Sequence, residues 1–137
     1  MADTNTFKLQ IVSPDRIFFD EDVDMVELTT TEGDLGILKD HIPLTAITVP
    51  GVLTIHQNGG IRQAAVHDGF VEILKDKVIV LAEASEWPEE IDINRANEAK
   101  IRAERRLRGE DGSEINVQRA EAALRKALIR IEIAEKH

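Results

Sequence analysis

The sequence predicts an all-β N-terminal part, a sandwich or barrel over residues 1–86, followed by a C-terminal α-helical hairpin over residues 87–137. Short apolar runs separated by turns fill the first part, and no long helical period interrupts them. From Asp92 onward, alanine, arginine and glutamate dominate and β-branched residues become scarce. Pro88 lies between these two compositions and prevents a strand from continuing. The length of 137 residues fits one domain or two small units.

The apolar residues of the first part follow the two-residue period of half-buried strands. Phe7, Leu9 and Ile11 alternate with polar residues, and a turn at Ser13-Pro14-Asp15 ends this run. Asn58-Gly59-Gly60 and Lys75-Asp76-Lys77 each separate two apolar runs and predict two hairpins. Further strands are expected over residues 17–19, 26–31, 42–49, 52–57, 61–66, 70–74 and 78–82.

The segment over residues 32–36 predicts a turn. Gly33 and Gly36 permit positive φ on either side of Leu35. This segment and the residues after it carry apolar side chains where a loop is ordinarily polar: Leu35, Ile37 and Leu38. Two interpretations stay open, since these side chains either fold into the core or form a rigid, partly apolar tip that docks another protein.

The second part predicts two antiparallel helices. Asp92 is expected to cap a first helix that ends near Leu107, and Asn116 or Ser113 is expected to cap the second. A five-residue loop over residues 109–113 makes the two helices neighbours. A narrow apolar seam recurs at three- and four-residue spacing along the second helix: Val117, Ala120, Leu124, Ala127, Ile131 and Ala134.

The first helix offers mainly alanines to this seam, at Ala96, Ala99 and Ala103. Alanine lets two helices approach closely but buries little apolar area, so the hairpin gains little free energy from packing. Two interpretations stay open: a detachable element of low stability, from which conformational switches are drawn, or an ordinary hairpin that stays docked.

The net charge of −9 belongs entirely to the first part. Residues 1–86 carry 6 basic and 15 acidic side chains, whereas residues 87–137 carry 11 of each, including eight of the ten arginines. An acidic body repels phosphate backbones, so we expect no nucleic-acid binding. The arginines of the second part suit either a compact anion or a solvated surface of ion pairs, and charge alone favours the ion pairs.

The sequence holds no pattern typical of catalysis, metal binding or membrane insertion. Cysteine is absent, no P-loop or nucleophile elbow is found, and the four histidines lack metal-ligand spacing: His41, His56, His67 and His137. Asp40 and His41 are adjacent, and adjacent residues of an extended chain point to opposite faces, so a turn histidine with structural hydrogen bonds is expected. The longest apolar run, residues 78–82, is far shorter than the ~20 residues of a membrane helix. Without a basic N-terminal region typical of a signal peptide, we expect a soluble intracellular protein.

A candidate anion site involves both helices and the segment Ile91-Asp92-Ile93-Asn94-Arg95-Ala96. Arg95 and Arg102 are two helical turns apart, Lys126 and Arg130 are one turn apart, and the hairpin would bring the four cations together. Glu86 and Asp92 lie at the edge of this set. A nucleotide suits the layout, with cations for the phosphates and carboxylates for the sugar and base. The alternative is interhelical ion pairing, which spacing alone favours, with Glu98, Glu104, Glu121 and Glu132.

The whole chain resembles the epsilon subunit family of bacterial F-type ATP synthase. The most specific match is Gly33-Asp34-Leu35-Gly36-Ile37-Leu38 followed by His41-Ile42-Pro43-Leu44, with further matches at Val12-Ser13-Pro14-Asp15 and Gly69-Phe70-Val71-Glu72-Ile73. His67-Asp68 departs from the family, whose members often carry a small residue and a glycine there. We expect this departure to change the local turn and not the family.

The resemblance implies a flattened sandwich of about ten strands and a helix–turn–helix. It implies a non-catalytic subunit of the rotating central stalk, which binds the gamma subunit, stands on the c ring and helps to couple proton flow to ATP synthesis. The segment over residues 33–41, with Asp34 and His41, matches the part that meets the c ring. The subunit would lie at the cytoplasmic face of the bacterial cell membrane without inserting into it. Its helices would extend into the alpha/beta catalytic hexamer to inhibit ATP hydrolysis.

The resemblance also implies a regulatory ATP site in the compact form. Residues 91–96 fit the family motif [IL]-D-x-x-R-A through Ile91, Asp92, Arg95 and Ala96. The accessory positions match Glu86, Arg102, Lys126 and Arg130, with a lysine at 126 where the family has an arginine that forks onto phosphate. ATP would favour the compact form by binding it better than the extended one. Two alternatives remain: a purely structural rotor coupler without functional ATP binding, and a small enzyme built around Asp40 and His41.

Overall fold

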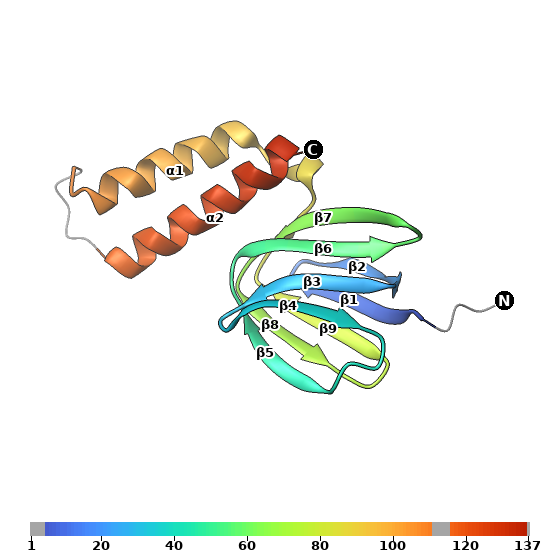
Figure 1. Cartoon of the computed structure of the whole chain (residues 1–137). Coiled ribbons are helices and arrows are strands. Elements are labelled where there is room, and N and C mark those ends of the chain that lie inside the picture. The colour runs from blue at the N-terminus through green and yellow to red at the C-terminus, as the bar shows by residue number, and fades with distance from the viewer. Residues whose placement is uncertain (1–4, 111–115, 137) are drawn as a thin grey trace. The chain divides into compact units, whose positions relative to one another are not determined.

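The computed structural model describes residues 5–110 and 116–136, and the chain divides into two compact units, Met1–Glu86 and Trp87–His137 (Figure 1). The first is called the β unit and the second the helical unit. Within the described residues the β unit contains ten strands: β1 (Phe7–Ser13), β2 (Arg16–Val23), β3 (Met25–Thr30), β4 (Gly33–Leu38), β5 (Leu44–Thr48), β6 (Gly51–Gln57), β7 (Gly60–Val66), β8 (Gly69–Ile73), β9 (Lys77–Ala82) and β10 (Ser85–Glu86).

The ten strands form one sheet in the order β10-β7-β6-β3-β5-β8-β9-β1-β2, with β4 paired to β3. The pairs are antiparallel except for β1 and β9, which are parallel. The sheet folds over so that its two halves face each other as layers (Figure 1). The largest fully buried side chains of the unit fill the space between the layers and include Leu9, Ile11, Ile37, Leu53, Ile55, Ile73, Val26, Val71 and Val80. The predicted β-sandwich is confirmed.

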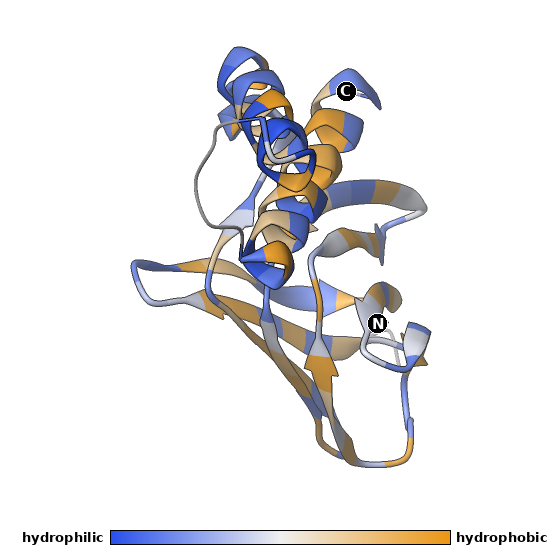
Figure 2. Ribbon diagram, turned by 90° about the vertical axis from the view of Figure 1, so that its left-hand side faces the viewer, coloured by the Kyte–Doolittle hydropathy of each residue, from blue (hydrophilic) through white to orange (hydrophobic). Residues whose placement is uncertain are grey.

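The alternation that predicted the strands is visible in their burial. In β1, Phe7, Leu9, Ile11 and Ser13 are buried, whereas the residues between them are only part-buried. Hydrophobic and hydrophilic residues accordingly alternate along the strands in Figure 2. The hairpin predicted after β6 is also confirmed, because residues 58 and 59 both adopt positive φ, 53° and 77°, in a two-residue turn that matches the strand twist.

The predicted turn over residues 32–36 is wrong, because four of these five residues belong to β4. Thr31 and Glu32 alone form the turn, and β4 pairs residue by residue with β3 from Thr30↔Gly33 to Met25↔Leu38. Gly33 has a φ of 114°, whereas Gly36 lies in ordinary extended backbone. Glycine marks a turn when read locally, but a full ladder of hydrogen bonds to β3 overrides that signal.

Three other strands differ from expectation by more than one residue. β2 extends to Val23, beyond the predicted residues 17–19, because its acidic residues pair with β1 while their side chains face solvent. β5 covers Leu44–Thr48 and is shorter than residues 42–49. The two-residue strand β10 was not predicted, since only its pairing with β7 defines it.

The helical unit consists of a 3-10 turn, η1 (Pro88–Glu90), and two helices, α1 (Ile93–Leu107) and α2 (Val117–Lys136). The predicted cap at Asp92 is confirmed. Asn116 caps α2, because its side-chain oxygen accepts a hydrogen bond from the backbone N–H of Arg119 at 3.1 Å. The alternative cap, Ser113, and residues 111–113 of the predicted loop lie outside the described residues.

Alanine dominates the packing of the two helices, as predicted. The buried residues are Ala96 and Ala103 of α1 and Ala120, Ala127 and Ile133 of α2. Val117 was placed in the apolar seam, but its side chain is 49% exposed. Ile133 was not placed there, and it is fully buried on a different face of α2. The three- and four-residue spacing therefore predicted the alanines that pack between the helices. It did not predict the burial of Ile133, which lies on another face of α2.

Candidate functional site

Asp92 organises the beginning of α1. Its carboxylate oxygen Oδ1 accepts hydrogen bonds from the backbone N–H groups of Asn94 and Arg95 at 3.0 and 3.2 Å, and its carbonyl accepts one from Ala96 at 3.0 Å. The backbone N–H of Ile91 donates to the Pro88 carbonyl at 3.2 Å and ends η1. Three of the four motif residues thus have a structural role, since Ala96 is buried as well. The Arg95 side chain is exposed and available to a ligand.

The predicted cations lie on both helices of this unit. Arg95 and Arg102 are exposed on α1, and Lys126 and Arg130 are part-buried on α2. The helices pack in opposite directions, so the beginning of α1 lies beside the end of α2 (Figure 1). Of the glutamates considered as alternative partners, Glu132 bonds Lys136 of its own helix at 3.1 Å. Guanidinium and ammonium donors on two neighbouring helices suit a polyanion such as a polyphosphate.

Glu86, the last residue of the β unit, is bonded to a buried histidine. The Nε2 atom of His67 lies 3.0 Å from Oε1 of Glu86. The His67 side chain is fully buried, whereas 24% of the Glu86 side chain is exposed. Strand β10 itself is held by its pairing with β7 and by Arg16, which donates to the Ser85 carbonyl at 3.0 Å. The sequence analysis expected only a changed local turn at His67-Asp68 and missed the bond between His67 and Glu86.

The structure separates the two residues predicted to meet the c ring. Asp34 lies near the beginning of β4, where its Oδ1 accepts a hydrogen bond from the Thr29 hydroxyl at 3.1 Å. His41 lies beyond the end of β4, in a turn where Asp40 has a φ of 65°. The segment over residues 33–41 is therefore a strand followed by a turn, and not one tip.

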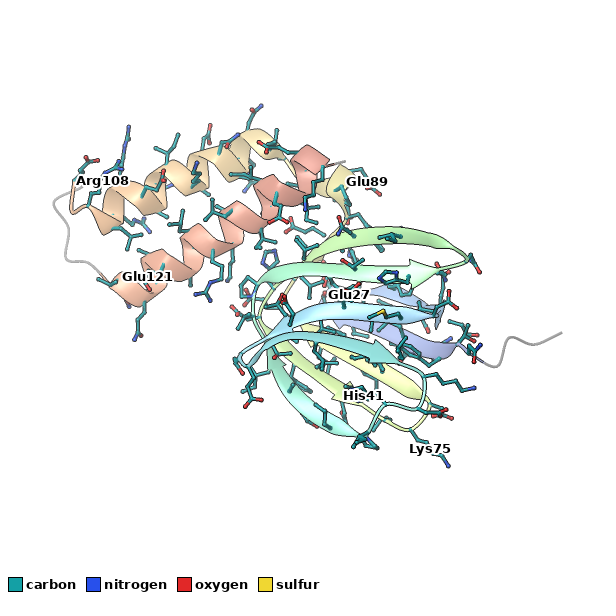
Figure 3. The ribbon with its side chains drawn as sticks, in the orientation of Figure 1. Glu27, His41, Lys75, Glu89, Arg108 and Glu121 are labelled. Carbon is teal, nitrogen blue, oxygen red and sulfur yellow. The ribbon has the colours of Figure 1, made fainter. Side chains whose placement is uncertain are left out.

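His41 makes the structural hydrogen bonds expected of a turn histidine. Its Nδ1 lies 2.8 Å from the Ile42 carbonyl oxygen, and its backbone N–H donates to the Leu38 carbonyl at 3.3 Å. A small hollow is lined both by this turn and by the β8–β9 turn, and Figure 3 shows His41 and Lys75 at the same end of the sandwich. We call residues 38–42 and 74–77 the turn end. It exposes three large apolar side chains, Leu38 (58%), Ile42 (77%) and Leu74 (40%).

A row of apolar side chains crosses the outer face of one layer. Register pairs Ile47 with Phe70, Phe70 with Leu81, Leu81 with Val12 and Val12 with Ile17, across β5, β8, β9, β1 and β2. Three members of this outer apolar row are exposed: Ile17 (66%), Ile47 (61%) and Phe70 (41%). Contiguous exposed apolar residues mark interaction surfaces. The sequence does contain a signal for this row: residues 78–82 of β9 are apolar at every position, so both faces of the strand are apolar.

No helix within residues 5–110 and 116–136 combines the length and apolar character needed to cross a bilayer. The same residues contain no group of three or more His, Cys, Asp or Glu side chains placed to ligate a metal ion.

Two family profiles match the chain. The β-sandwich domain of the ATP synthase delta/epsilon chain matches residues 6–88, and the long α-helix domain of that chain matches residues 89–135. The ATP synthase epsilon chain of Caldanaerobacter subterraneus subsp. tengcongensis is 47% identical over 133 residues, which cover 96% of each chain. That of Desulforamulus reducens is 44% identical over 130 residues, which cover 95% of this chain and 98% of the relative.

A solved structure shares the fold. In the Euglena gracilis mitochondrial ATP synthase (OSCP/F1/c-ring in rotational state 1), one chain aligns with a TM-score of 0.79 and 24% identity, over 96% of this chain and 82% of that chain. The family profiles and the bacterial relatives show that the chain belongs to the ATP synthase delta/epsilon chain family, and the relatives named above are epsilon chains.

Proposed function

We propose that the chain is a non-catalytic subunit of the central stalk of an F-type ATP synthase. The β unit would couple proton translocation to ATP synthesis by joining the gamma subunit to the c ring. The helical unit would inhibit ATP hydrolysis when it extends into the alpha/beta hexamer, and bound ATP would favour the compact form. The subunit would then be peripheral at the cytoplasmic face of the bacterial cell membrane. The names of the relatives support membership of an ATP synthase. The helical unit, with arginines on a helix that packs through alanine, supports the regulatory role.

One observation carries the regulatory part: exposed arginines lie on a helix that packs mainly through alanine. Ala96, Ala103, Ala120 and Ala127 bury little apolar area, so the packed and separated states of the two helices are expected to differ little in free energy. A ligand that binds only the compact state then shifts the equilibrium, because its stabilisation grows with its concentration over its dissociation constant.

The proposed ATP site assigns different tasks to its residues. Arg95 and Arg102 would bind phosphate from α1, and Lys126 and Arg130 would do so from α2. Asp92 and Ala96, with Ile91, would hold the beginning of α1 in the shape that presents Arg95. Glu86 would accept a hydrogen bond from the sugar or base.

A second candidate is a structural rotor coupler that does not bind ATP. It is favoured by the roles of Asp92 and Ala96, because capping and packing by themselves account for these two motif residues. Under this function the hairpin would stay docked at every ATP concentration.

Calorimetric titration of the isolated chain with ATP distinguishes the two functions. We expect binding by the wild type and affinity about tenfold weaker in Arg95→Ala, which loses a charged hydrogen-bond donor. Arg105→Ala is the matched control, since Arg105 is an exposed arginine of the same helix outside the proposed site. Trp87 fluorescence provides a second signal, because this tryptophan follows Glu86 directly.

Hydrogen exchange tests the regulation itself. Amides of α1 and α2 should exchange faster than those of the β strands, and ATP should slow them. Deleting residues 88–137 should relieve inhibition of ATP hydrolysis in the assembled enzyme. Two results would reject the regulatory function and favour the structural coupler. One is the absence of ATP binding, and the other is helix amides that are protected as strongly as the strand amides both with and without ATP.

A further inference from the structure

Three buried hydroxyl groups of the β unit lack hydrogen-bond partners. The Oγ atoms of Ser13 and Ser85 and the Oγ1 atom of Thr48 neither donate nor accept a hydrogen bond among the described residues. The three residues are only 6%, 5% and 2% exposed, so these atoms do not reach bulk water either. A buried hydroxyl without a partner raises the free energy of the folded state, because water bonds the same group when it is exposed.

All three side chains face the interior of the β unit. Ser13 continues the buried alternation of β1. Thr48 follows Ile47 of the outer apolar row directly, and successive residues of a strand point to opposite faces, so Thr48 points inward. Ser85 pairs with Val66, a buried core residue, and directly paired residues of antiparallel strands point to the same face. The sandwich itself therefore encloses the three hydroxyls.

Register places Ser13 and Thr48 at the same end of the sandwich. Gly69 of β8 pairs with Thr48 of β5 on one side and with Ala82 of β9 on the other. The parallel register of β1 and β9, continued by one residue, places Ser13 beside Ala82. Two strands, β8 and β9, thus lie between the two hydroxyl residues.

Ser85 lies at this end as well. It belongs to β10, which is at the opposite limit of the sheet order from β2. Arg16 of β2 pairs with Ser13 and donates to the Ser85 carbonyl at 3.0 Å. We call the end that holds Ser13, Thr48 and Ser85 the hydroxyl end. It is opposite the turn end, because β9 begins in the turn end at Lys77 and finishes in the hydroxyl end at Ala82.

The two ends differ in the apolar area that they bury. Each of β1, β8 and β9 carries a large apolar residue near the turn end and a small or polar residue at the hydroxyl end: Phe7 against Ser13, Ile73 against Gly69, and Val78 against Ala82. The three large side chains are at most 4% exposed. Because burial stabilises in proportion to apolar area, local opening requires less free energy at the hydroxyl end than at the turn end.

We propose that the hydroxyl end of the β unit opens locally while the turn end stays packed, and that the three unpaired hydroxyls favour this opening because it exposes them to water. The inference concerns the β unit alone and does not depend on the proposed function. Ser85 belongs to the last strand before the helical unit. Opening therefore separates β10 from β7 and lengthens the connection between the two units.

Native-state hydrogen exchange of the full chain tests the local opening. Three backbone N–H groups report on the hydroxyl end: Thr31, His67 and Glu83 donate to the carbonyls of Ile47, Ala84 and Asp68 at 2.9, 3.0 and 2.8 Å. In the wild type these amides should exchange faster than the ladder amides of β1 and β9 next to the turn end. Their exchange should also depend less on urea, because local opening exposes less surface than global unfolding.

Removing an unpaired hydroxyl should stabilise the closed state. Ser13→Ala, Ser85→Ala and Thr48→Val delete the hydroxyl and leave the backbone unchanged, including the Ser85 carbonyl that Arg16 bonds. In each variant we expect about tenfold slower exchange of the three reporting amides. Ser13 and Thr48 are two strands apart, so the effects should multiply to about a hundredfold in the double variant.

Thr30→Val is the matched control for Thr48→Val. Thr30 is also buried and pairs with Thr48, but its hydroxyl donates to the Gly33 carbonyl at 2.8 Å and accepts the Glu32 N–H at 3.1 Å. Both variants add the same apolar group, and only Thr30→Val loses hydrogen bonds, so exchange should become about tenfold faster. Thr45→Val removes an exposed hydroxyl of the same strand as Thr48 and should leave exchange unchanged.

Each outcome decides the proposal. Equal urea dependence of the amides at the two ends of the wild type overturns it, as does unchanged or faster exchange in two or more of the three hydroxyl variants. Slowing in Thr30→Val as large as in Thr48→Val would assign the effect to apolar area and would also overturn it. These results leave ATP binding untouched, so the proposed function is decided separately. Should Thr48→Val not fold, Ser13→Ala, Ser85→Ala and the wild-type urea dependence still decide.

Discussion

The Oδ1 atom of Asp92 lies 3.2 Å from the backbone nitrogen of Arg95 and accepts its hydrogen bond. The same carboxylate accepts the N–H of Asn94, so one side chain satisfies two of the donors that a helix leaves open at its N-terminus. Arg95 is thus tied to the cap by its backbone, while its side chain is exposed. The cap thus fixes the backbone of residue 95 relative to Asp92, whichever side chain that residue carries.

Loss of the cap should destabilise α1. Asp92→Ala is expected to lower the free energy of unfolding of the helical unit by about 1 kcal/mol, whereas Asp92→Ser should retain most of it because serine also caps helices. Hydrogen exchange of the α1 amides measures this difference. Equal protection in Asp92→Ala and the wild type would show that the capping bonds contribute nothing to stability.

A gain of ATP affinity is expected from Lys126→Arg. A guanidinium donates two parallel hydrogen bonds to a phosphate, whereas the ammonium group acts as a point charge, so we expect an increase of about threefold to tenfold. Lys100→Arg on α1, outside the proposed site, controls for added arginine. Calorimetry measures both variants, and an affinity that is unchanged or lower in Lys126→Arg would place residue 126 away from the phosphates.

The outer apolar row is predicted to bind the gamma subunit. Ile47→Ser should weaken binding of purified gamma subunit about tenfold without lowering stability, because Ile47 is 61% exposed and its loss creates no cavity. Ile61→Ser is the matched control, since Ile61 of β7 is 63% exposed and lies outside the row. Surface-based binding kinetics provide the measurement, and equal effects of the two variants would reject this face.

Gly69 is required by close backbone approach. A Cβ at this position would overlap the Leu81 carbonyl oxygen and the Ala82 Cα of β9, neither of which can rotate away. Gly69→Ala should therefore cost more than about 3 kcal/mol of unfolding free energy. At Gly60, a Cβ would meet only the Gln57 carbonyl oxygen at 3.6 Å, an ordinary contact, so Gly60→Ala should be tolerated. Urea unfolding compares the two, and similar midpoints would contradict the prediction.

The exposed pair of Lys8 and Asp20 should titrate outside the ordinary ranges. Lys8 Nζ lies 2.9 Å from Asp20 Oδ1, and this bond lowers the pKa of Asp20 below 3.8 and raises the pKa of Lys8 above 10.5. Because the pKa of Asp20 is lowered in the folded state, the ionised carboxylate stabilises the fold above pH 3.8. This stability is lost as the pH falls through the folded-state pKa of Asp20. Because the pKa of Lys8 is raised in the folded state, the charged ammonium group stabilises the fold below pH 10.5. This stability is lost as the pH rises through the folded-state pKa of Lys8.

NMR titration of both side chains checks this pair. In Asp20→Asn, the pKa of Lys8 should move back toward 10.5, because the hydrogen bond to the Asp20 carboxylate is the largest cause of the rise in that pKa. An Asp20 pKa at or above 3.8 in the wild type would contradict the assignment.

The predictions from sequence held where a local pattern determines structure. The cap at Asp92, the turn after Gln57 and the alternating burial of β1 each depend on residues within a few positions of one another. The turn assigned to residues 32–36 failed because β4 forms through hydrogen bonds to β3 that a glycine-rich segment does not reveal.

The sequence by itself determined the two-part organisation, the helix ends and the motif at residues 91–96, because short-range periodicity and capping specify them. Only the tertiary structure decided the parallel pairing of β1 with β9, the joining of two distant turns at one end, and the bond between His67 and Glu86. The physical reason is that strand register aligns residues far apart in the chain, and the free energy that fixes it comes from packing both layers at once.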